Sequence, residues 1–118
     1  PLSTPAVKLL EALPRSDSSD LVFAGADDKP LSDMALTAVM RRMEVDAVPH
    51  GFRSTFRDWV GDCTNHPRDV AEFALAHKLS DKVEASYRRS DALEKRRQMM
   101  EEWADFCAKL PDLELRES

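Results

Sequence analysis

The amino-acid sequence predicts a small, mainly α-helical domain. Only three of its 118 residues are glycine and 7% are aromatic. Ala, Leu, Met, Glu, Lys and Arg are frequent, and their side chains lose little rotamer freedom in a helix. Apolar residues also recur at helical spacing in several segments, so an all-β architecture is not expected.

A first helix is expected over about residues 4–13, because Ser3-Thr4-Pro5 supplies an N-cap followed by a proline early in the first turn. The polar segment 14–20 should form a loop. Leu21-Val22-Phe23 is too short for a helix and predicts a buried extended stretch that anchors this loop.

Two further helices are expected in the middle of the chain. One should open at Leu31-Ser32, with Ser32 as its N-cap. Its apolar face comprises Leu36, Val39, Met40 and Met43. The other should follow Val48-Pro49, because proline holds the residue before it extended. Its apolar residues repeat at helical spacing: Phe52, Phe56, Trp59, Val60 and Cys63.

Three shorter patterns predict helices in the remainder of the chain. A turn at 65–68 leads into a helix carrying Val70, Phe73 and Ala74. Ser80-Asp81 can cap the next helix, and Asp91 with Glu94 matches a capping box for the last one. The last helix has an apolar stripe and a proline stop before a polar, acidic tail at 111–118: Met100, Trp103, Cys107, Leu110 and Pro111.

Charge is distributed unevenly along the chain. The net charge of −5 disfavours DNA binding, since affinity for a polyanion rests on clustered Lys and Arg. Residues 78–97 nevertheless contain seven basic and four acidic side chains, whereas residues 98–118 contain two basic and six acidic ones. The sequence is therefore compatible with a DNA-facing basic surface outside the tail.

The cysteines and the hydropathy pattern indicate the compartment. Cys63 and Cys107 show neither the spacing of a disulfide framework nor that of zinc ligands, which fits a reducing environment. No apolar run approaches the roughly 20 residues that span a bilayer, and no leader-like segment opens the sequence. We therefore expect a cytoplasmic protein with no membrane partner.

Four side chains suit metal-free phosphoryl transfer. His50 and Arg53 lie one helical turn apart, where both can reach one anionic group, and His77 and Tyr87 follow without an acidic metal cluster. Arginine can hold phosphate oxygens with a bidentate fork, and tyrosine can act as a nucleophile. The tyrosine hydroxyl has a reference pKa of about 10, so it needs a base, for which His50 is our candidate. No metal or cofactor is expected.

With their neighbours, these residues resemble the catalytic domain of the tyrosine recombinases, specifically the phage and prophage integrases. The resemblance covers nearly the whole chain and rests on four motifs in order: His50-Gly51-Phe52-Arg53-Ser54-Thr55-Phe56, Leu75-Ala76-His77-Lys78, Val83-Glu84-Ala85-Ser86-Tyr87-Arg88-Arg89 and Met99-Met100-Glu101-Glu102-Trp103-Ala104-Asp105. Ala76 departs from the family, which usually has glycine at that position.

The resemblance implies site-specific DNA recombination that integrates or excises a prophage or genomic island. Tyr87 would attack the scissile phosphate to give a 3′-phosphotyrosyl link. Arg53 would hold a non-bridging oxygen, His50 would assist proton transfer at the nucleophile, and His77 would donate a hydrogen bond to the phosphate. The implied partners are double-stranded DNA attachment sites and other integrase protomers, with expected DNA contacts from Lys78, Lys82, Arg88 and Arg89.

The family also uses an earlier arginine and a lysine on a β-hairpin, and neither has a counterpart in this sequence. Residues 1–118 are therefore expected to be the C-terminal part of an integrase catalytic domain that begins after both groups. We expect this chain to be inactive by itself, because losing one donor to the transition state can cost roughly 100- to 1000-fold in rate.

A second interpretation is a non-enzymatic helical module that binds DNA or another protein. In that case His50 would cap a helix, Arg53 would pair with Asp58 or Glu72, and His77 would be a solvated cation at a helix end. Tyr87 would be half-buried, and His66 has no expected role in either case. The two interpretations differ in geometry, since the first requires His50, Arg53, His77 and Tyr87 to share one face.

Overall fold

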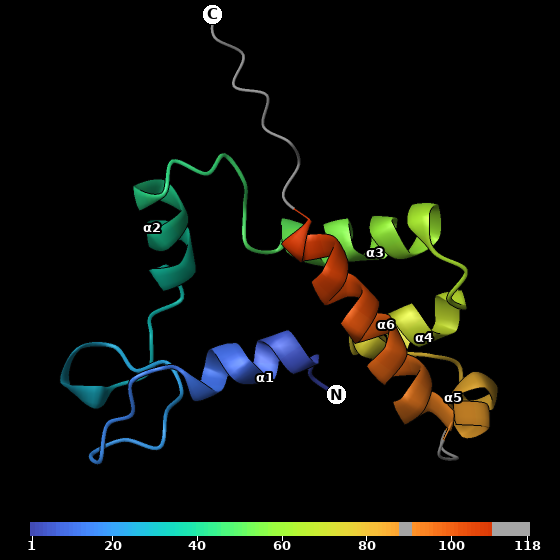
Figure 1. Cartoon of the computed structure of the whole chain (residues 1–118), viewed down its shortest axis with the longest axis horizontal. Helices are drawn as coiled ribbons and strands as arrows, with labels where there is room; N and C mark the ends of the chain where they lie inside the picture. Colours follow the sequence, from blue (N-terminus) through green and yellow to red (C-terminus); the bar gives the residue numbers. More distant parts are fainter. Residues whose placement is uncertain (88–90, 110–118) are drawn as a thin grey trace, which may run out of the picture.

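Helices supply the regular structure of the computed structural model, which describes residues 1–87 and 91–109, although not the side chains at 83, 86, 87 and 91. The helices are α1 (Thr4–Glu11), the short 3-10 helix η1 (Ala26–Asp28), α2 (Ala35–Arg42), α3 (Gly51–Cys63), α4 (Arg68–Ala74), α5 (Asp81–Tyr87) and α6 (Asp91–Ala108) (Figure 1). Within the described residues, β structure is limited to an isolated bridge between Ala24 and Pro30. The predicted mainly α-helical class is confirmed.

The core lies where α3, α4 and α6 pack together, with α6 running across α4 (Figure 1). Its buried residues are Phe56, Trp59, Val60, Val70, Ala71 and Met99. The half-buried Trp103 joins them, and its ring meets Phe56 edge to face with centroids 5.3 Å apart. Aromatic pairs in this arrangement add roughly 0.5–1.5 kcal/mol to the stabilisation from buried area.

The predicted pattern is confirmed for the centre of α3 but not for its ends. Phe56, Trp59 and Val60 are buried, whereas Phe52 is 56% exposed and Cys63 is also exposed. Cys63 lines a surface pocket together with Asp105 and Phe106 of α6, which leaves its side chain exposed. The predicted helix is confirmed, and its helical repeat is buried only at Phe56, Trp59 and Val60.

The stripe on α6 is shifted from the predicted one. Met99 is fully buried, Met100 and Trp103 are half-buried, and Cys107 is exposed. Burial raises the pKa of the Cys107 thiol even so. The predicted Asp91 capping side chain, Leu110, and the tail at 111–118 lie outside the described residues.

The start of α1 is fixed as the sequence predicts. Ser3 is buried and its hydroxyl accepts a hydrogen bond from the Ala6 amide at 3.4 Å, as an N-cap should. The Thr4 amide and hydroxyl both donate to Glu101 Oε1, at 2.6 and 2.8 Å. This carboxylate from α6 therefore lies at the positive end of the α1 dipole and docks the helix on the core.

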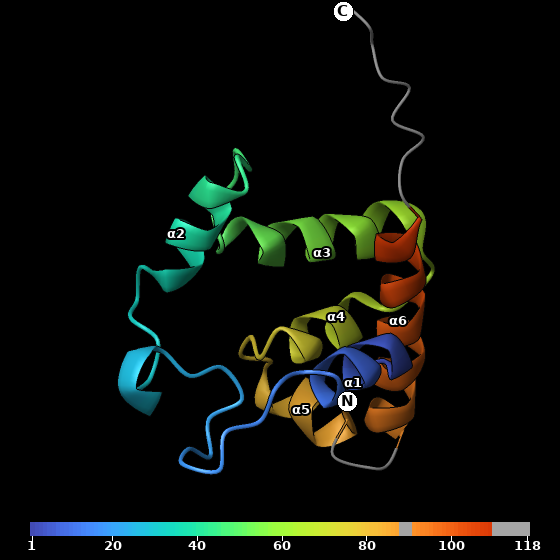
Figure 2. The same ribbon diagram turned by 60° about the vertical axis from the view of Figure 1, so that its left-hand side comes forward.

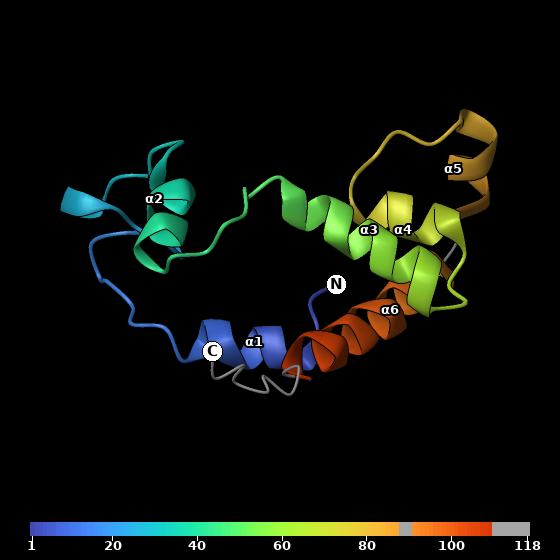
Figure 3. The ribbon, with the colours of Figure 1, turned by 90° about the horizontal axis from the view of Figure 1, so that it is seen from above.

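The segment between α1 and α3 extends away from the core helices, as the view from above shows (Figure 3). The radius of gyration is 17.5 Å, whereas a compact chain of this length has about 13.5 Å. Leu21, Val22 and Phe23 are 42%, 61% and 57% exposed. The prediction of a buried stretch there was wrong, because Leu21 and Val22 line an open surface pocket beside α1 instead of packing into the core.

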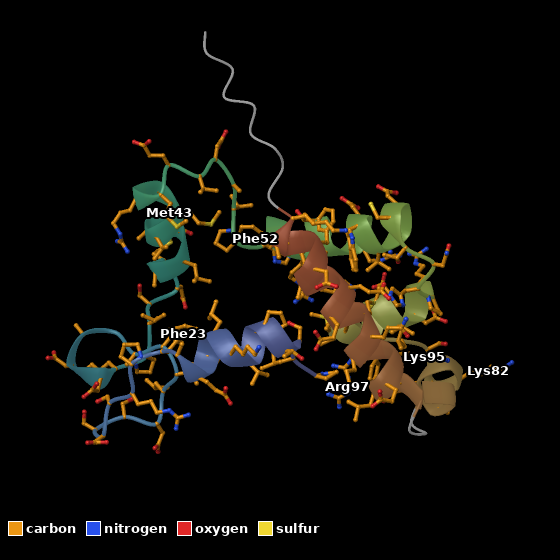
Figure 4. The ribbon with its side chains drawn as sticks, viewed as in Figure 1. Phe23, Met43, Phe52, Lys82, Lys95 and Arg97 are labelled. Carbon is orange, nitrogen blue, oxygen red and sulfur yellow. The ribbon has the colours of Figure 1, made fainter. Side chains whose placement is uncertain are left out.

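The predicted apolar face of α2 is largely uncovered. Only Met40 is buried, whereas Leu36 and Met43 are 60% and 67% exposed, and Figure 4 shows Met43 and Phe23 standing well away from α6. The helix also starts later than predicted: Met34 occupies its N-cap position without a side-chain hydrogen bond. The Ser32 carbonyl instead accepts from the Ala35 amide at 3.0 Å, in a turn that precedes the helix.

Candidate phosphate-binding site

The first turn of α3 presents His50 and Arg53 together. His50 is the N-cap residue and Arg53 lies three residues later, so the two exposed side chains share one face of the helix. The amides of residues 51, 52 and 53 donate to the carbonyls of residues 48, 49 and 50, at 2.9, 3.3 and 3.1 Å. An anion at this helix end would therefore be bound by side chains. The imidazole of His50 forms no capping hydrogen bond, so the capping interpretation was wrong.

A sharp turn at the end of α4 places His77. Ala76 adopts a left-handed backbone with φ 55°, and its amide donates to the Phe73 carbonyl at 3.1 Å. The His77 amide donates to the Glu72 carbonyl at 2.9 Å, which completes a Schellman motif. Glycine normally occupies the left-handed position. Here alanine takes the same conformation, at a cost of roughly 1–2 kcal/mol.

Arg53 joins this turn to the first turn of α3. Its Nη2 donates a hydrogen bond to the Leu75 carbonyl oxygen, two residues before His77. Figure 2 shows the segment that follows α4 lying beneath the start of α3. The structure thus brings the His50–Arg53 turn and the His77 segment together, and Arg53 pairs with neither Asp58 nor Glu72.

Glu72 is surrounded by three positively charged or protonatable side chains. Its Oε1 accepts from Arg57 Nε at 2.7 Å and lies 3.8 Å from Arg68 Nε, while Oε2 bonds His77 Nδ1. The hydrogen bonds from Arg57 and, secondly, His77 lower the pKa of Glu72 despite an opposing effect of burial. Glu72 therefore stays ionised at neutral pH.

Sequence reasoning missed the pairing of Arg57 with Glu72. Arg57 follows Arg53 by four residues and so lies on the same side of α3. That spacing could have marked Arg57 as an alternative partner for Glu72, which the non-enzymatic interpretation gave as one of two possible partners of Arg53.

His66 has a structural contact that the sequence did not predict. Its Nε2 lies 2.6 Å from Glu102 Oε2, and this hydrogen bond lowers the pKa of Glu102. The side chain of His66 is only 12% exposed. The contact ties the segment between α3 and α4 to α6, outside the candidate site.

The position of the tyrosine side chain is not described. Tyr87 is the last residue of α5, and α5 stands apart from the first turn of α3 in all three ribbon views (Figures 1, 2 and 3). The proposed nucleophile therefore stays a prediction.

Some of the predicted DNA contacts are exposed at the end of the molecule that carries α5. Lys78 and Lys82 are exposed, whereas Arg88 and Arg89 lie outside the described residues. Figure 4 shows Lys82 on α5, which lies beside the start of α6; Lys95 and Arg97 lie on the first half of α6, where Arg97 points away from α5. Arg97 Nε is 3.2 Å from Glu94 Oε1, which offsets part of this positive charge.

The described residues contain neither a candidate metal site nor a candidate membrane span. No group of three or more His, Cys, Asp or Glu side chains in residues 1–87 and 91–109 is arranged to hold a metal ion. None of the helices in that part of the chain is both long and apolar enough to span a bilayer.

The chain is similar in sequence to integrases of phages and prophages. It is 36% identical over 111 residues to the prophage integrase IntA of Escherichia coli K12, covering 90% of this chain and 27% of that protein. It is 33% identical over 112 residues to the integrase of Shigella phage Sf6 and 34% identical over 114 residues to that of Enterobacteria phage P4. The chain spans 29% and 26% of those two proteins. No family model and no solved structure matches it.

Proposed function

Because this chain is a relative of the phage integrases that corresponds to a little over a quarter of their length, we propose that it is the C-terminal part of a tyrosine recombinase catalytic domain. The parent protein would cut and rejoin double-stranded DNA at attachment sites, integrating or excising a prophage or genomic island. Other integrase protomers would hold the paired DNA sites.

The observation that carries this proposal is the contact between Arg53 and the Leu75 carbonyl. It joins two motifs that lie more than twenty residues apart in the sequence, and both carry groups suited to a phosphate. Arginine has five N–H donors in a planar fork, and the described residues use one of them here. The remaining donors can bind the non-bridging oxygens of a DNA phosphate.

The chemistry proposed for this site conserves the energy of the phosphodiester bond. The Tyr87 oxygen attacks phosphorus, a 3′-phosphotyrosyl link forms, and the bond to the 5′ oxygen breaks to release a hydroxyl. His50 receives the phenolic proton, Arg53 stabilises the charge on the phosphate oxygens, and His77 donates a hydrogen bond to the same group. This step requires α5 to bring Tyr87 to the first turn of α3.

The remaining groups would come from the rest of the integrase. The family pattern includes an earlier arginine and a β-hairpin lysine, which protonates the leaving oxygen. We propose that the 118-residue chain alone does not cleave DNA, because several charged groups act together in the transition state. Cleavage of a nicked attachment-site substrate by the purified chain would contradict this.

Covalent trapping tests the proposed nucleophile. The full-length integrase is incubated with a nicked attachment-site duplex, from which the short cleaved strand diffuses away, and the adduct is digested and mapped by mass spectrometry. The modified residue should be Tyr87. Tyr87→Phe should abolish the adduct with little change in DNA affinity, since only the nucleophilic oxygen is removed. An adduct on another residue, or one that survives this substitution, would contradict the assignment.

The separation of α5 from α3 favours one alternative function, a DNA-binding or protein-interaction module without catalysis. In that case the full-length protein would bind attachment-site DNA and form no covalent adduct under any trapping condition. The same mass-spectrometric experiment therefore separates the two functions.

A further inference from the structure

We propose that Glu72 is a positioning residue for His77: it keeps the proton on Nδ1 of the imidazole and directs Nε2 towards the scissile phosphate. This inference rests on the proposed function, because it concerns how the phosphate-binding histidine is presented. Neither the sequence motifs nor the similarity to integrases assigned this role to Glu72.

Glu72 holds His77 at two points. The Glu72 carbonyl accepts the His77 amide at 2.9 Å, and its carboxylate Oε2 bonds the ring at Nδ1. The other carboxylate oxygen, Oε1, is held by Arg57 from α3 at 2.7 Å. The carboxylate is therefore fixed from both sides, and it fixes the ring in turn.

The charge state of Glu72 decides which ring nitrogen carries the proton. An ionised carboxylate can only accept hydrogen bonds, so Nδ1 must be the donor. The pKa of Glu72 is lowered by Arg57 and His77, which keeps the carboxylate ionised. Nε2 carries no proton when the ring is neutral. It donates to the phosphate only when the ring carries both protons, and the Glu72 carboxylate stabilises that cation through the bond at Nδ1.

The exposure of the His77 side chain is consistent with a ring that is held at Nδ1 and open to a ligand at Nε2. It is 46% exposed, whereas the Glu72 side chain is 19% exposed. The ring thus has a sheltered edge at Glu72 and another edge open to a ligand. Carboxylate–imidazole pairs of this kind fix the tautomer and orientation of histidines at many functional sites.

The chain contains an internal control for the tautomer. His66 bonds Glu102 through Nε2 instead of Nδ1, so its neutral ring should carry the proton on Nε2. The described residues provide no hydrogen-bond partner for the ring of His50, which should populate both tautomers. We therefore expect a different tautomer state for each of the three histidines of this chain: Nδ1–H, Nε2–H and a mixture of both.

Nuclear magnetic resonance can read these signatures directly. Long-range proton–nitrogen spectra of the labelled chain, recorded at alkaline pH where imidazoles are neutral, distinguish the protonated nitrogen of each ring. We expect Nδ1–H for His77 and Nε2–H for His66. An Nε2–H tautomer at His77 in the unmodified chain would overturn the proposal without any substitution.

Two substitutions separate this role from the ion pair between α3 and α4. Glu72→Gln removes the charge, and because Arg57 occupies the amide oxygen, the amide NH2 group faces Nδ1 and favours the Nε2–H tautomer. Arg57→Gln breaks the same ion pair but keeps the carboxylate beside His77. We expect the His77 tautomer to change in the first variant and persist in the second. A persistent Nδ1–H in folded Glu72→Gln would overturn the proposal.

The same pair of variants in the full-length integrase tests the consequence for cleavage. At saturating nicked DNA, Glu72→Gln should lower the cleavage rate by roughly 10- to 100-fold, as loss of such supporting carboxylates typically does, with DNA affinity unchanged. Arg57→Gln should stay within a few-fold of wild type. Equal rates in the two variants would overturn the role of Glu72.

The outcome for His77→Ala separates failure of this inference from failure of the proposed function. If His77→Ala is impaired while Glu72→Gln cleaves like wild type, only the role of Glu72 fails. If His77→Ala itself cleaves at the wild-type rate, the role of His77 in the proposed function fails, and the role of Glu72 fails with it.

Discussion

The helices α2 and α3 carry similar apolar patterns, but the apolar side chains of α3 are buried and those of α2 are mostly exposed. In α3 the repeat ends in burial, with Val60 1% exposed, because α4 and α6 cover its central face. In α2 the repeat leaves Leu36 60% exposed, because no described helix reaches that face. An apolar repeat thus fixes which side of a helix can be buried, while a partner elsewhere in the molecule decides whether it is. The described residues of the candidate site, His50, Arg53 and His77, lie on α3 and after α4, in the half of the molecule formed by α3, α4 and α6, which we call the covered half.

Matched methionine substitutions should show this contrast most strongly. Met99 is fully buried between the core helices, whereas Met43 is 67% exposed on α2. Met99→Ala should lower the free energy of unfolding by about 2–5 kcal/mol, since it leaves a cavity. Met43→Ala should change it by about 0.5 kcal/mol or less. Urea denaturation followed by circular dichroism measures both values.

Comparable losses in the two variants would break the comparison. They would mean that the Met43 side chain is covered in solution and that the segment between α1 and α3 packs against the core. Tryptophan fluorescence provides a second measurement, because Trp59 and Trp103 both lie in the core.

Acid should weaken the covered half selectively. The pKa values of Glu72 and Glu102 are lowered from 4.5, chiefly by hydrogen bonds from Arg57 and His66 respectively. A carboxyl group with a lowered pKa in the folded state stabilises the fold above its unfolded pKa and loses that contribution as pH falls through the folded value. Unfolding free energy should therefore drop on acidification below about pH 4.5, by roughly 1–2 kcal/mol, since both groups keep some contact with water.

The double variant Glu72→Gln/Glu102→Gln provides the control for this pH dependence. Its urea midpoint should vary less between pH 5 and pH 3 than that of the unmodified chain. An equally steep decline in the double variant would show that other carboxylates are responsible.

Two similar turns, one after α4 and one after α2, give the smallest expected change in stability. Ala76 after α4 and Glu44 after α2 both adopt left-handed backbones, with φ 55° and 56°, in Schellman motifs. Glycine relieves the strain at such positions, so Ala76→Gly should stabilise the core by roughly 0.5–1 kcal/mol. Glu44→Gly should leave the urea midpoint unchanged, because α2 does not pack on the core. A shift of the midpoint by Glu44→Gly would show that α2 unfolds together with the core.

The elements that sequence reasoning predicted well depend on neighbouring residues along the chain. Ser3 caps α1, and Pro49 lies in the turn that opens α3, because capping and proline sterics act locally. Leu21-Val22-Phe23 and Ser32 were predicted wrongly, since burial of an apolar run and use of a potential cap depend on what packs against them. Tertiary partners outweighed the local pattern there.

The same distinction applies to the candidate site. The spacing of His50 and Arg53 was sufficient to place them on one face of α3. The contact of Arg53 with Leu75 and the attachment of His77 to Glu72 depend on the left-handed turn at Ala76, which the sequence does not favour because alanine stands where glycine would be expected. The feature of the site that the sequence did not predict is therefore the left-handed backbone conformation of Ala76.

The most direct test of the central claim compares two arginines on α3 in the proposed full-length integrase. Arg53→Lys and Arg57→Lys both keep a positive charge but lose the planar fork, and single-turnover cleavage of nicked attachment-site DNA is measured at saturating protein. If Arg53 holds the scissile phosphate, Arg53→Lys should lower the rate by roughly 100-fold or more, while Arg57→Lys stays within a few-fold of wild type. Wild-type cleavage by Arg53→Lys, or an equal loss in both variants, would contradict the assignment of the phosphate site to the first turn of α3.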